Sequence, residues 1–186
     1  MKQVRRSIAL VGMMGVGKSS VGRCLHRRTG LALHDTDEII VANFGMSIAE
    51  IFAEHGEKKF REAETETLRR IRTEAQTIIV GGGGIVLRDE NVGILRSHTV
   101  IVWLDADEQT LFARAVREQN RPLLKTKNPK KTFSRILCVR RLLYAKVADI
   151  RVDTSGLTDE EAAVAILAKL RRINPKPKSA TKPKLS

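Results

Sequence analysis

The stretch at residues 12–19, which reads GMMGVGKS, constrains the fold of this chain more than any other part of the sequence. It fits the pattern G-x-x-x-x-G-K-[ST], whose glycines let successive backbone N–H groups turn toward phosphate oxygens. An apolar run at 8–11 precedes the stretch, and a helix-like segment from 18 to about 28 follows it. This order of strand, turn and helix predicts a phosphate-binding loop at the start of a helix.

The last two residues of the motif have chemical roles of their own. The Lys18 side chain can reach the β- and γ-phosphates of a nucleotide, and the Ser19 hydroxyl suits Mg²⁺. An ordinary glycine-rich turn would not explain why a lysine and a serine begin the helix. The motif therefore favours phosphate binding over a purely structural turn.

Length and composition favour one folded domain with anionic ligands. The chain has 186 residues, 42% of them apolar, and can bury one sizeable core. No run of about 18 apolar residues occurs, which argues against a membrane span. The two cysteines lie far apart in the sequence and suit a reducing, cytoplasmic environment. The net charge of +13 suits polyanionic ligands and also permits contact with nucleic acid.

Apolar runs and helix-like segments alternate, which predicts an α/β fold with a parallel sheet covered on both faces. We expect strands at 7–11, 31–34, 78–80, 100–104 and 150–152. We expect helices at 18–28, 37–43, 47–54, 57–72, 89–97, 107–118, 133–148 and 158–172. The domain would span 1–172, with an exposed, mobile segment at about 120–131 and a basic, disordered tail at 173–186.

Two carboxylates, Asp35 and Asp37, follow the second expected strand, at the end of the sheet where ligands gather. One could help to hold Mg²⁺ through water, and the other could accept a hydrogen bond from a substrate hydroxyl. Asp37 could instead simply cap the helix that follows. The spacing alone leaves these alternatives open.

Other candidate residues are also open on the sequence alone. The four glycines at 81–84 could bring backbone N–H groups close to a ligand, or could form a flexible loop. Arg61 lies on a highly charged helix, where a solvated arginine is the simpler interpretation. Arg121 begins the exposed segment and Arg140 lies on the next helix. A loop arginine can stabilise a transferring phosphoryl group, but either of these arginines could be solvated.

Taken in order, these motifs resemble those of the shikimate kinases over about residues 7–169. The residues that carry the resemblance are Gly12-x-x-Gly15-x-Gly17-Lys18-Ser19, Asp35-Thr36-Asp37, Gly45-x-Ser47-Ile48-x-Glu50-Ile51-Phe52, Gly56-Glu57-x-x-Phe60-Arg61-x-x-Glu64, Gly82-Gly83-Gly84, Arg121-Pro122-Leu123-Leu124, Tyr144 and Val152-Asp153-Thr154. The resemblance implies a three-layer P-loop kinase fold with a central five-stranded parallel sheet, a helical substrate-binding region and a mobile lid at about 120–131.

The resemblance also implies an activity and a set of site residues. The γ-phosphate of ATP would pass, with Mg²⁺, to the 3-hydroxyl of shikimate, on the route to chorismate and aromatic amino acids. The catalytic residues would be Lys18, Asp37 and Arg121, and the metal would be served by Ser19 and, through water, Asp35. Shikimate would contact Asp37, Arg61, Gly82, Gly83, Gly84 and Arg140. ATP would contact Gly12, Gly15, Val16, Gly17, Lys18, Ser19, Ser20, Arg114 and Arg121.

The expected enzyme would be a cytoplasmic monomer whose partners are ATP and shikimate, without a membrane or a specific nucleic acid. Two departures from the family pattern leave positions open. Gly81 replaces a common Thr or Ser, so the register of 82–84 could shift by one residue. Arg140 and Arg141 are adjacent, and Arg140 is preferred because it keeps the family's four-residue offset to Tyr144.

Two other functions are alternatives. A gluconate-type small-molecule kinase would share the fold, but Asp37, Arg61 and the triple glycine suit a carboxylated, polyhydroxylated ring. A nucleotide-dependent nucleic-acid-binding protein would explain the basic charge, but the chain lacks the interleaved aromatic residues of a single-strand platform.

Overall fold

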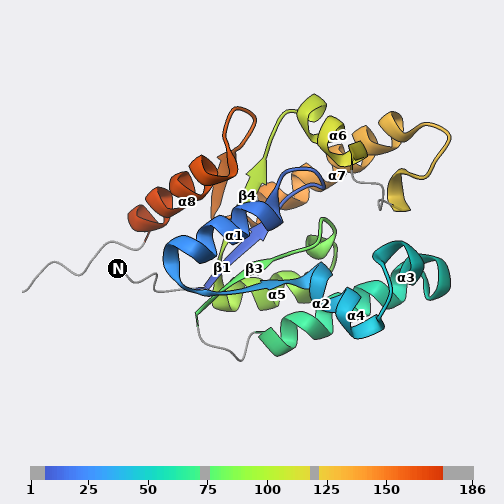
Figure 1. Ribbon diagram of the computed structural model, residues 1–186, viewed down its shortest axis with the longest axis horizontal. Helices are drawn as coiled ribbons and strands as arrows, with labels where there is room; N and C mark the ends of the chain where they lie inside the picture. Colours follow the sequence, from blue (N-terminus) through green and yellow to red (C-terminus); the bar gives the residue numbers. More distant parts are fainter. Residues whose placement is uncertain (1–6, 72–75, 118–121, 174–186) are drawn as a thin grey trace, which may run out of the picture.

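A computed structural model describes residues 7–71, 76–117 and 122–173, and these form a three-layer α/β domain (Figure 1). Five parallel strands make one sheet in the order β2-β3-β1-β4-β5. The strands are β1 Ser7–Val11, β2 Ala32–Asp35, β3 Thr77–Val80, β4 Thr99–Asp105 and β5 Ile150–Asp153. The predicted sheet is confirmed, and each strand begins and ends within one residue of its expected place.

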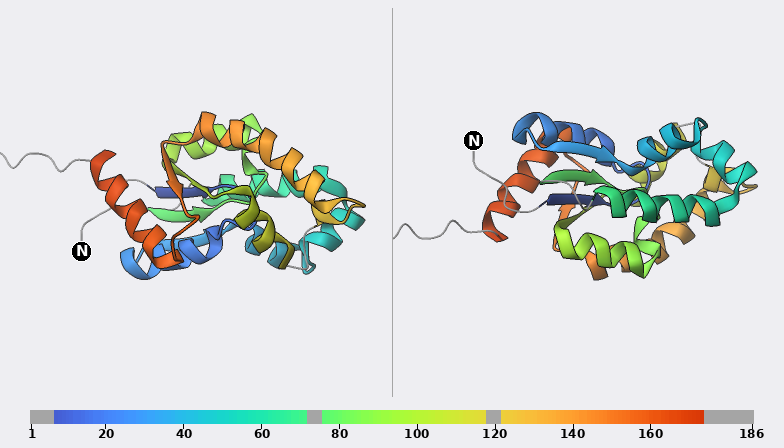
Figure 2. Two further views of the ribbon diagram at one scale, coloured as in Figure 1. Left: turned by 90° about the horizontal axis from the view of Figure 1, so that it is seen from above. Right: turned by 90° about the horizontal axis from the view of Figure 1, so that it is seen from below.

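Helices cover both faces of the sheet, α1 and α8 on one face and α5 and α7 on the other (Figure 2). The described helices are α1 Lys18–Thr29, α2 Thr36–Phe44, α3 Ile48–Glu54, α4 Gly56–Ile71, α5 Asp89–His98, α6 Glu108–Arg117, α7 Pro129–Val147 and α8 Asp159–Ile173, with short 3-10 turns η1 Ile85–Leu87 and η2 Pro122–Leu124. Within the described residues, no helix is long and apolar enough to cross a membrane.

The main core lies on both faces of the sheet. Every residue of β3 and β4 is buried, as expected for strands that helices cover on both sides. A smaller apolar cluster joins α2, α3 and α4 at one end of the molecule. Its buried members are Ile40, Ile51 and Phe60, and the rings of Phe52 and Phe60 lie 5.0 Å apart. This second cluster supports the predicted helical region away from the sheet (Figure 1).

Asp35, rather than Asp37, caps the helix after the second strand. Its side chain accepts hydrogen bonds from the backbone N–H groups of Asp37 and Glu38, and α2 therefore begins at Thr36. The expectation that Asp37 starts this helix is wrong. A carboxylate at the N-cap can satisfy N–H groups two and three residues later, which Asp37 is too far along the chain to do here.

Two other boundaries differ from expectation. Gly56 begins α4, with a φ angle of 77°, one residue before the expected start at 57, while α3 ends at Glu54 as expected. The segment at 120–131 is not wholly irregular, since η2 lies within it and α7 begins at Pro129. The Asn128 side chain caps α7 by accepting from the Lys131 N–H, and proline suits the first turn of a helix. Residues 120 and 121 and the tail beyond 173 lie outside the described residues.

Candidate active site

The loop between β1 and α1 curls tightly against its neighbours, and two of its glycines have no room for a side chain. A Cβ on Gly12 would lie 2.3 Å from the Leu104 carbonyl oxygen, and a Cβ on Gly15 would lie 2.5 Å from that of Leu111. Their φ angles of 149° and 84° also disfavour other residues. The first N–H groups of α1 have no partner within the helix, so the loop can hold an anion there.

A cavity opens at this end of α1, and we call it the phosphate cavity. The Lys18 ammonium lies above the loop, where it donates to the carbonyl oxygens of Gly12 and Met13 over 3.0 and 3.1 Å. The lining residues are Met14, Gly15, Gly17, Lys18, Ser19, Ser20, Arg23, Asp35, Asp37, Glu38, Val80, Gly81 and Gly83. The cavity thus combines a cation with a helix N-terminus, an arrangement suited to phosphate groups.

Ser19 and Asp35, the two residues predicted to serve a metal ion, meet in the phosphate cavity. The Ser19 hydroxyl donates to Asp35 Oδ2 over 2.7 Å, and the Asp35 carboxylate is only 8% exposed. Both side chains offer hard oxygen ligands, and Mg²⁺ is commonly bound by one or two such groups plus phosphate oxygens. The residues present therefore fit a divalent metal ion that is bound together with a nucleotide.

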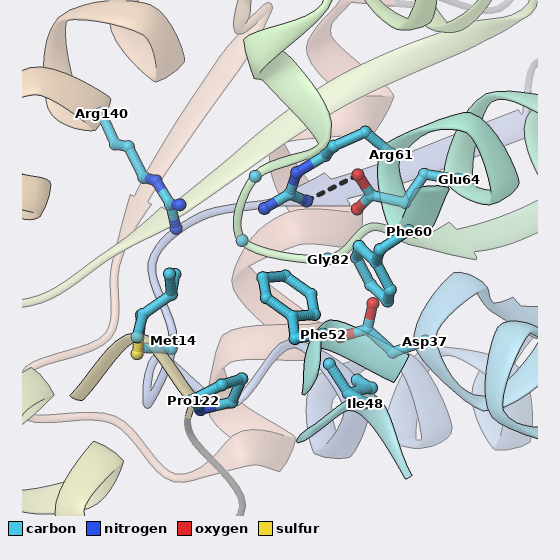
Figure 3. A pocket seen from close by; sticks show the side chains of 13 residues that line it. Met14, Asp37, Ile48, Phe52, Phe60, Arg61, Glu64, Gly82, Pro122 and Arg140 are labelled. Carbon is cyan, nitrogen blue, oxygen red and sulfur yellow. Dashed lines mark hydrogen bonds and ion pairs between the residues drawn. The ribbon is translucent and has the colours of Figure 1, made fainter. Parts of the chain in front are cut away.

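A second cavity, which we call the arginine cavity, adjoins the phosphate cavity and shares Met14, Asp37 and Gly83 with it. Arg61 and Arg140 approach it from opposite sides, and apolar side chains close the region between them (Figure 3). The full lining is Met14, Asp37, Ile48, Phe52, Phe60, Arg61, Glu64, Gly82, Gly83, Gly84, Pro122, Leu123 and Arg140.

Arg61 is oriented by two carboxylates on its own helix, α4. Its Nη1 donates to Glu64 Oε2 over 2.6 Å, and its Nε and Nη2 donate to Glu57 Oε1 over 3.2 and 2.9 Å. The spacings of three and four residues place all three side chains on one face. A Cβ on Gly84 would lie 2.5 Å from Arg61 Cζ, so only glycine lets the guanidinium occupy this place.

Glu64 is fully buried beside Arg61, a feature to which the sequence analysis gave no role. Burial raises its pKa to about 7, although the Arg61 guanidinium counteracts this shift and the Asp37 carboxylate adds to it. Among the described residues, Glu64 Oε1 has no hydrogen-bond partner. The available signal was the spacing: Glu64 lies four residues after buried Phe60 and four before buried Leu68.

The glycines at 81–84 line the two cavities. The Gly81 N–H donates to the Leu10 carbonyl oxygen at the end of the sheet, and Gly81 lines the phosphate cavity and not the arginine cavity. The next three residues, 82–84, all line the arginine cavity. A Cβ on Gly82 would lie 2.6 Å from Asp37 Oδ1 and 2.7 Å from Glu64 Oε1. Any residue other than glycine at this position would therefore have to displace these carboxylates.

Of the two adjacent arginines on α7, Arg140 lies in the arginine cavity, where it is 6% exposed. Arg141 instead donates to the Asp105 carboxylate. One turn further on, the Tyr144 hydroxyl donates to the Gly83 carbonyl oxygen. Burial raises the pKa of Tyr144 to about 12, so this hydroxyl stays protonated and remains a donor.

The remaining predicted residues have mixed placements. Ser20 lines the phosphate cavity with the other residues of the loop. Val16 is buried in the core, and Arg114 lies half-buried on α6; neither lines one of the two cavities. Arg121 lies outside the described residues, although its neighbour Pro122 lines the arginine cavity. Sequence reasoning did not single out Met14 as a lining residue of both cavities.

The parallel sheet, the phosphate-binding loop and the adjoining cavity with two arginines define a P-loop kinase with a small-molecule acceptor site. A family model described as shikimate kinase matches residues 14–171. The chain belongs to the shikimate kinase family. As a member of this family it is a phosphotransferase with an alcohol acceptor, which phosphorylates shikimate with ATP and a divalent metal.

Individual relatives agree with this assignment. A shikimate kinase from Thermodesulfovibrio yellowstonii is 41% identical over 91% of this chain and 97% of its own length. A shikimate kinase from Moorella thermoacetica is 42% identical over 86% of this chain and 90% of its own length. The structure of an Acinetobacter baumannii shikimate kinase in complex with shikimate has a TM-score of 0.87 at 32% identity, over 92% of this chain and 96% of that one.

The gluconate-type alternative shares the fold alone. A gluconokinase structure from Sinorhizobium meliloti covers 92% of this chain and 95% of its own, with a TM-score of 0.56 and 18% identity. The nucleic-acid-binding alternative rested on the basic charge, and the family assignment replaces it.

Proposed function

We propose that the phosphate cavity holds the phosphates of ATP with Mg²⁺, and that the arginine cavity holds shikimate with its 3-hydroxyl toward Asp37. The single observation that carries this proposal is that Asp37 lines both cavities. A group at their junction can touch both the acceptor hydroxyl and the phosphoryl group that it attacks. Phosphoryl transfer depends mainly on such positioning and on neutralising charge.

In this proposal the substrate carboxylate binds between Arg61 and Arg140. A guanidinium matches a carboxylate with two parallel hydrogen bonds, which a lysine cannot provide. The backbone of 82–84 lies against the ring, where the lack of side chains allows a close approach. The apolar side chains of Phe52, Phe60 and Leu123 exclude water that would otherwise compete as the acceptor.

Asp37 has the role of orienting the 3-hydroxyl and accepting its proton as the bond to phosphorus forms. Lys18 neutralises the phosphate oxygens, and Ser19 together with Asp35, the latter through water, would hold the metal ion. Arg121, at the start of the lid, adds positive charge to the transferring group, while Arg114 contacts the nucleotide. Mg²⁺ supplies charge neutralisation when it is bound with ATP.

We further propose that the enzyme works as a monomer in the cytoplasm. One chain supplies the residues to which we assign a role at the two cavities, and a monomer is the simplest assembly for this proposal. Cys24 and Cys138 are both free thiols, which suits a reducing compartment.

The test of the proposed function is a coupled ADP-release assay with MgATP and three acceptors in parallel: shikimate, gluconate and a nucleoside monophosphate. We expect turnover with shikimate alone, and phosphorus NMR of the product should show a phosphate ester at the 3-position. Turnover with another acceptor would refute the assigned contacts in the arginine cavity but not the roles of the phosphate-binding loop.

The buried carboxyl of Glu64 predicts a pH dependence of stability. Its pKa is raised from 4.5 to about 7, so the folded chain binds this proton more tightly than the unfolded chain does. The stabilisation is fully present below about pH 4.5, and it is lost as pH rises through about 7. The loss is of the order of 3 kcal/mol, from the size of the shift. Glu64→Gln, which cannot ionise, should lack this decline.

The measurement is urea unfolding of both proteins at several values between pH 4.5 and 8. The free-energy difference between the two proteins isolates Glu64 from carboxylates such as Asp153, whose pKa a hydrogen bond from Ser155 lowers. A difference that stays constant across this range would contradict the burial argument.

A further inference from the structure

Helix α7 carries two adjacent arginines, and the rotation of the helix decides which of them reaches the substrate. Successive residues of an α-helix point about 100° apart, so Arg140 and Arg141 cannot both face the arginine cavity. Arg140 faces it and is nearly fully buried, whereas Arg141 remains 35% exposed and turns toward β4. A contact that holds Arg141 therefore also fixes the direction of Arg140.

Arg141 is held at the carboxyl end of β4. Its Nε and Nη2 both lie 3.3 Å from Asp105 Oδ1, and its Nη2 also donates to the Ala106 carbonyl oxygen over 2.6 Å. The Asp105 side chain is 3% exposed, so this ion pair is screened by water only on the arginine side. Several donors of one rigid guanidinium fix its orientation better than a single bond would.

The Asp105 carboxylate is itself anchored from its other side. Its Oδ2 accepts from Arg151 Nη2 over 2.7 Å, and the Arg151 guanidinium lies over the Trp103 ring at 4.8 Å. Arg151 belongs to β5, and its ion pair within the described residues is with Asp105 and not with α7. It therefore fixes Asp105 within the sheet, while Arg141 links that fixed carboxylate to α7.

A second attachment lies further along α7, one turn after Arg140. The Tyr144 hydroxyl donates to the Gly83 carbonyl oxygen, and the Tyr144 ring lies 6.1 Å from that of Trp103. Arg140 therefore lies next to Arg141, which attaches α7 to β4, and one turn before Tyr144, which attaches α7 to the glycine loop. Its Nη1 lies 3.3 Å from the position that a Cβ on Gly83 would take.

We propose that Asp105 and Arg141 are positioning residues that hold α7 in the rotation in which Arg140 can bind the substrate carboxylate. This inference rests on the proposed role of Arg140. The ion pair also keeps Arg141 itself from competing for the carboxylate, since its guanidinium is already engaged at β4. Neither Asp105 nor Arg141 lines the arginine cavity, so their effect on shikimate is indirect.

The test uses Asp105→Asn, which keeps the side-chain shape but removes the charge, and Arg141→Met, which keeps the aliphatic stem. Each should raise the KM for shikimate by about 10- to 100-fold, the cost typical of lost supporting contacts, while the KM for ATP stays unchanged. Arg141→Lys, with charge but no planar fork, should give an intermediate KM. The double variant should be no worse than the more affected single variant, because both remove one interaction.

Arg151→Met removes the other partner of the same carboxylate but leaves the Arg141 contact in place, so it should raise the KM for shikimate less than Arg141→Met does. The matched control is Arg28→Met, which removes an arginine–carboxylate ion pair with Glu160 away from both cavities and should leave the KM for shikimate unchanged. A merely structural role for the ion pair would lower kcat and raise both KM values together with a fall in Tm. If Asp105→Asn does not fold, Arg141→Met, at a half-buried position, still tests the inference.

The carboxamide of shikimate separates failure of this inference from failure of the proposed function. Because the carboxamide cannot form an ion pair, its KM should not change in Arg141→Met, whereas that of shikimate should rise. Arg140→Met should behave in the same way and more strongly. If Arg140→Met raises the KM for shikimate and the Asp105 and Arg141 variants do not, the positioning role is overturned alone. If Arg140→Met leaves it unchanged, the role of Arg140 and the positioning role both fall.

Discussion

Replacing Arg61 by methionine is expected to raise the KM for shikimate by about two orders of magnitude or more, with little change in the KM for ATP. In our proposal Arg61 makes charge-assisted hydrogen bonds to the substrate carboxylate, and bonds to charged groups contribute about 1.5–3 kcal/mol each. Every 1.4 kcal/mol corresponds to about a tenfold change in affinity. Steady-state kinetics and calorimetry with shikimate both measure the effect.

The same substitution should also destabilise the fold, which requires a control. Without Arg61, the buried Glu64 carboxyl loses the donor to its Oε2. Its pKa should then rise further, so that it stays neutral over a wider pH range. Adding Glu64→Gln to Arg61→Met should recover stability without recovering shikimate affinity.

Arg69→Met is the matched substitution on α4. Arg69 pairs with Glu66 and Glu90 on the surface and does not line either cavity, so shikimate affinity should be unchanged. Unchanged affinity in Arg61→Met, measured by calorimetry on the folded variant, would refute its assignment to the carboxylate.

Replacing Lys18 by methionine should lower kcat by about 10²- to 10³-fold or more, the effect of removing one preorganised donor from a developing charge. The proposed contact is with the β- and γ-phosphates, so the KM for shikimate should change little. In the structure Lys18 already lies over the phosphate cavity, where it donates to Gly12 and Met13. The variant should therefore also lose a local contact within the loop.

Single-turnover kinetics with saturating ATP separate this loss of chemistry from a loss of nucleotide binding. Lys59→Met serves as the control, because Lys59 is exposed on α4 and contacts only Glu62 in the described ion pairs, at 3.8 Å. Retention of most of the single-turnover rate in Lys18→Met would show that the lysine does not neutralise the transferring group.

The sequence predicts the centre of the sheet well because β1, β3 and β4 are built on short apolar runs with clear ends. Strands that are covered on both faces contain few polar residues, and these three runs are followed by Gly12, Gly81 and Asp105. Helix starts are harder to predict, because a capping residue is defined by the hydrogen bonds that its side chain makes and not by its type alone. The sequence led us to expect Asp37 as the cap, and only the folded backbone brings the Asp35 carboxylate to the N–H groups of α2.

The residues of the site can be predicted where a motif fixes the shape of the backbone. They cannot be predicted where their role depends on the burial of a side chain or on the rotation of a helix. The phosphate-binding loop follows from its glycines and from Lys18 and Ser19. Glu64, by contrast, looks like one more surface carboxylate on a charged helix, although it is fully buried. Adjacent arginines on a helix cannot be told apart by spacing, so the choice of Arg140 depended on the family offset and not on geometry.

The three glycines at 82–84 limit how this enzyme could be redesigned. Each is opposed by a different working group: Gly82 by Asp37, Gly83 by Arg140 and Gly84 by Arg61. A Cβ on Gly82 or Gly84 would displace the group that faces it, and a Cβ on Gly83, 3.3 Å from Arg140 Nη1, would push that guanidinium by a few tenths of an ångström. Mutational libraries aimed at new acceptors should therefore leave this loop intact. Substitutions are better placed at Ile48, Phe52 and Leu123. These three residues also line the arginine cavity, but none of them faces one of the three glycines.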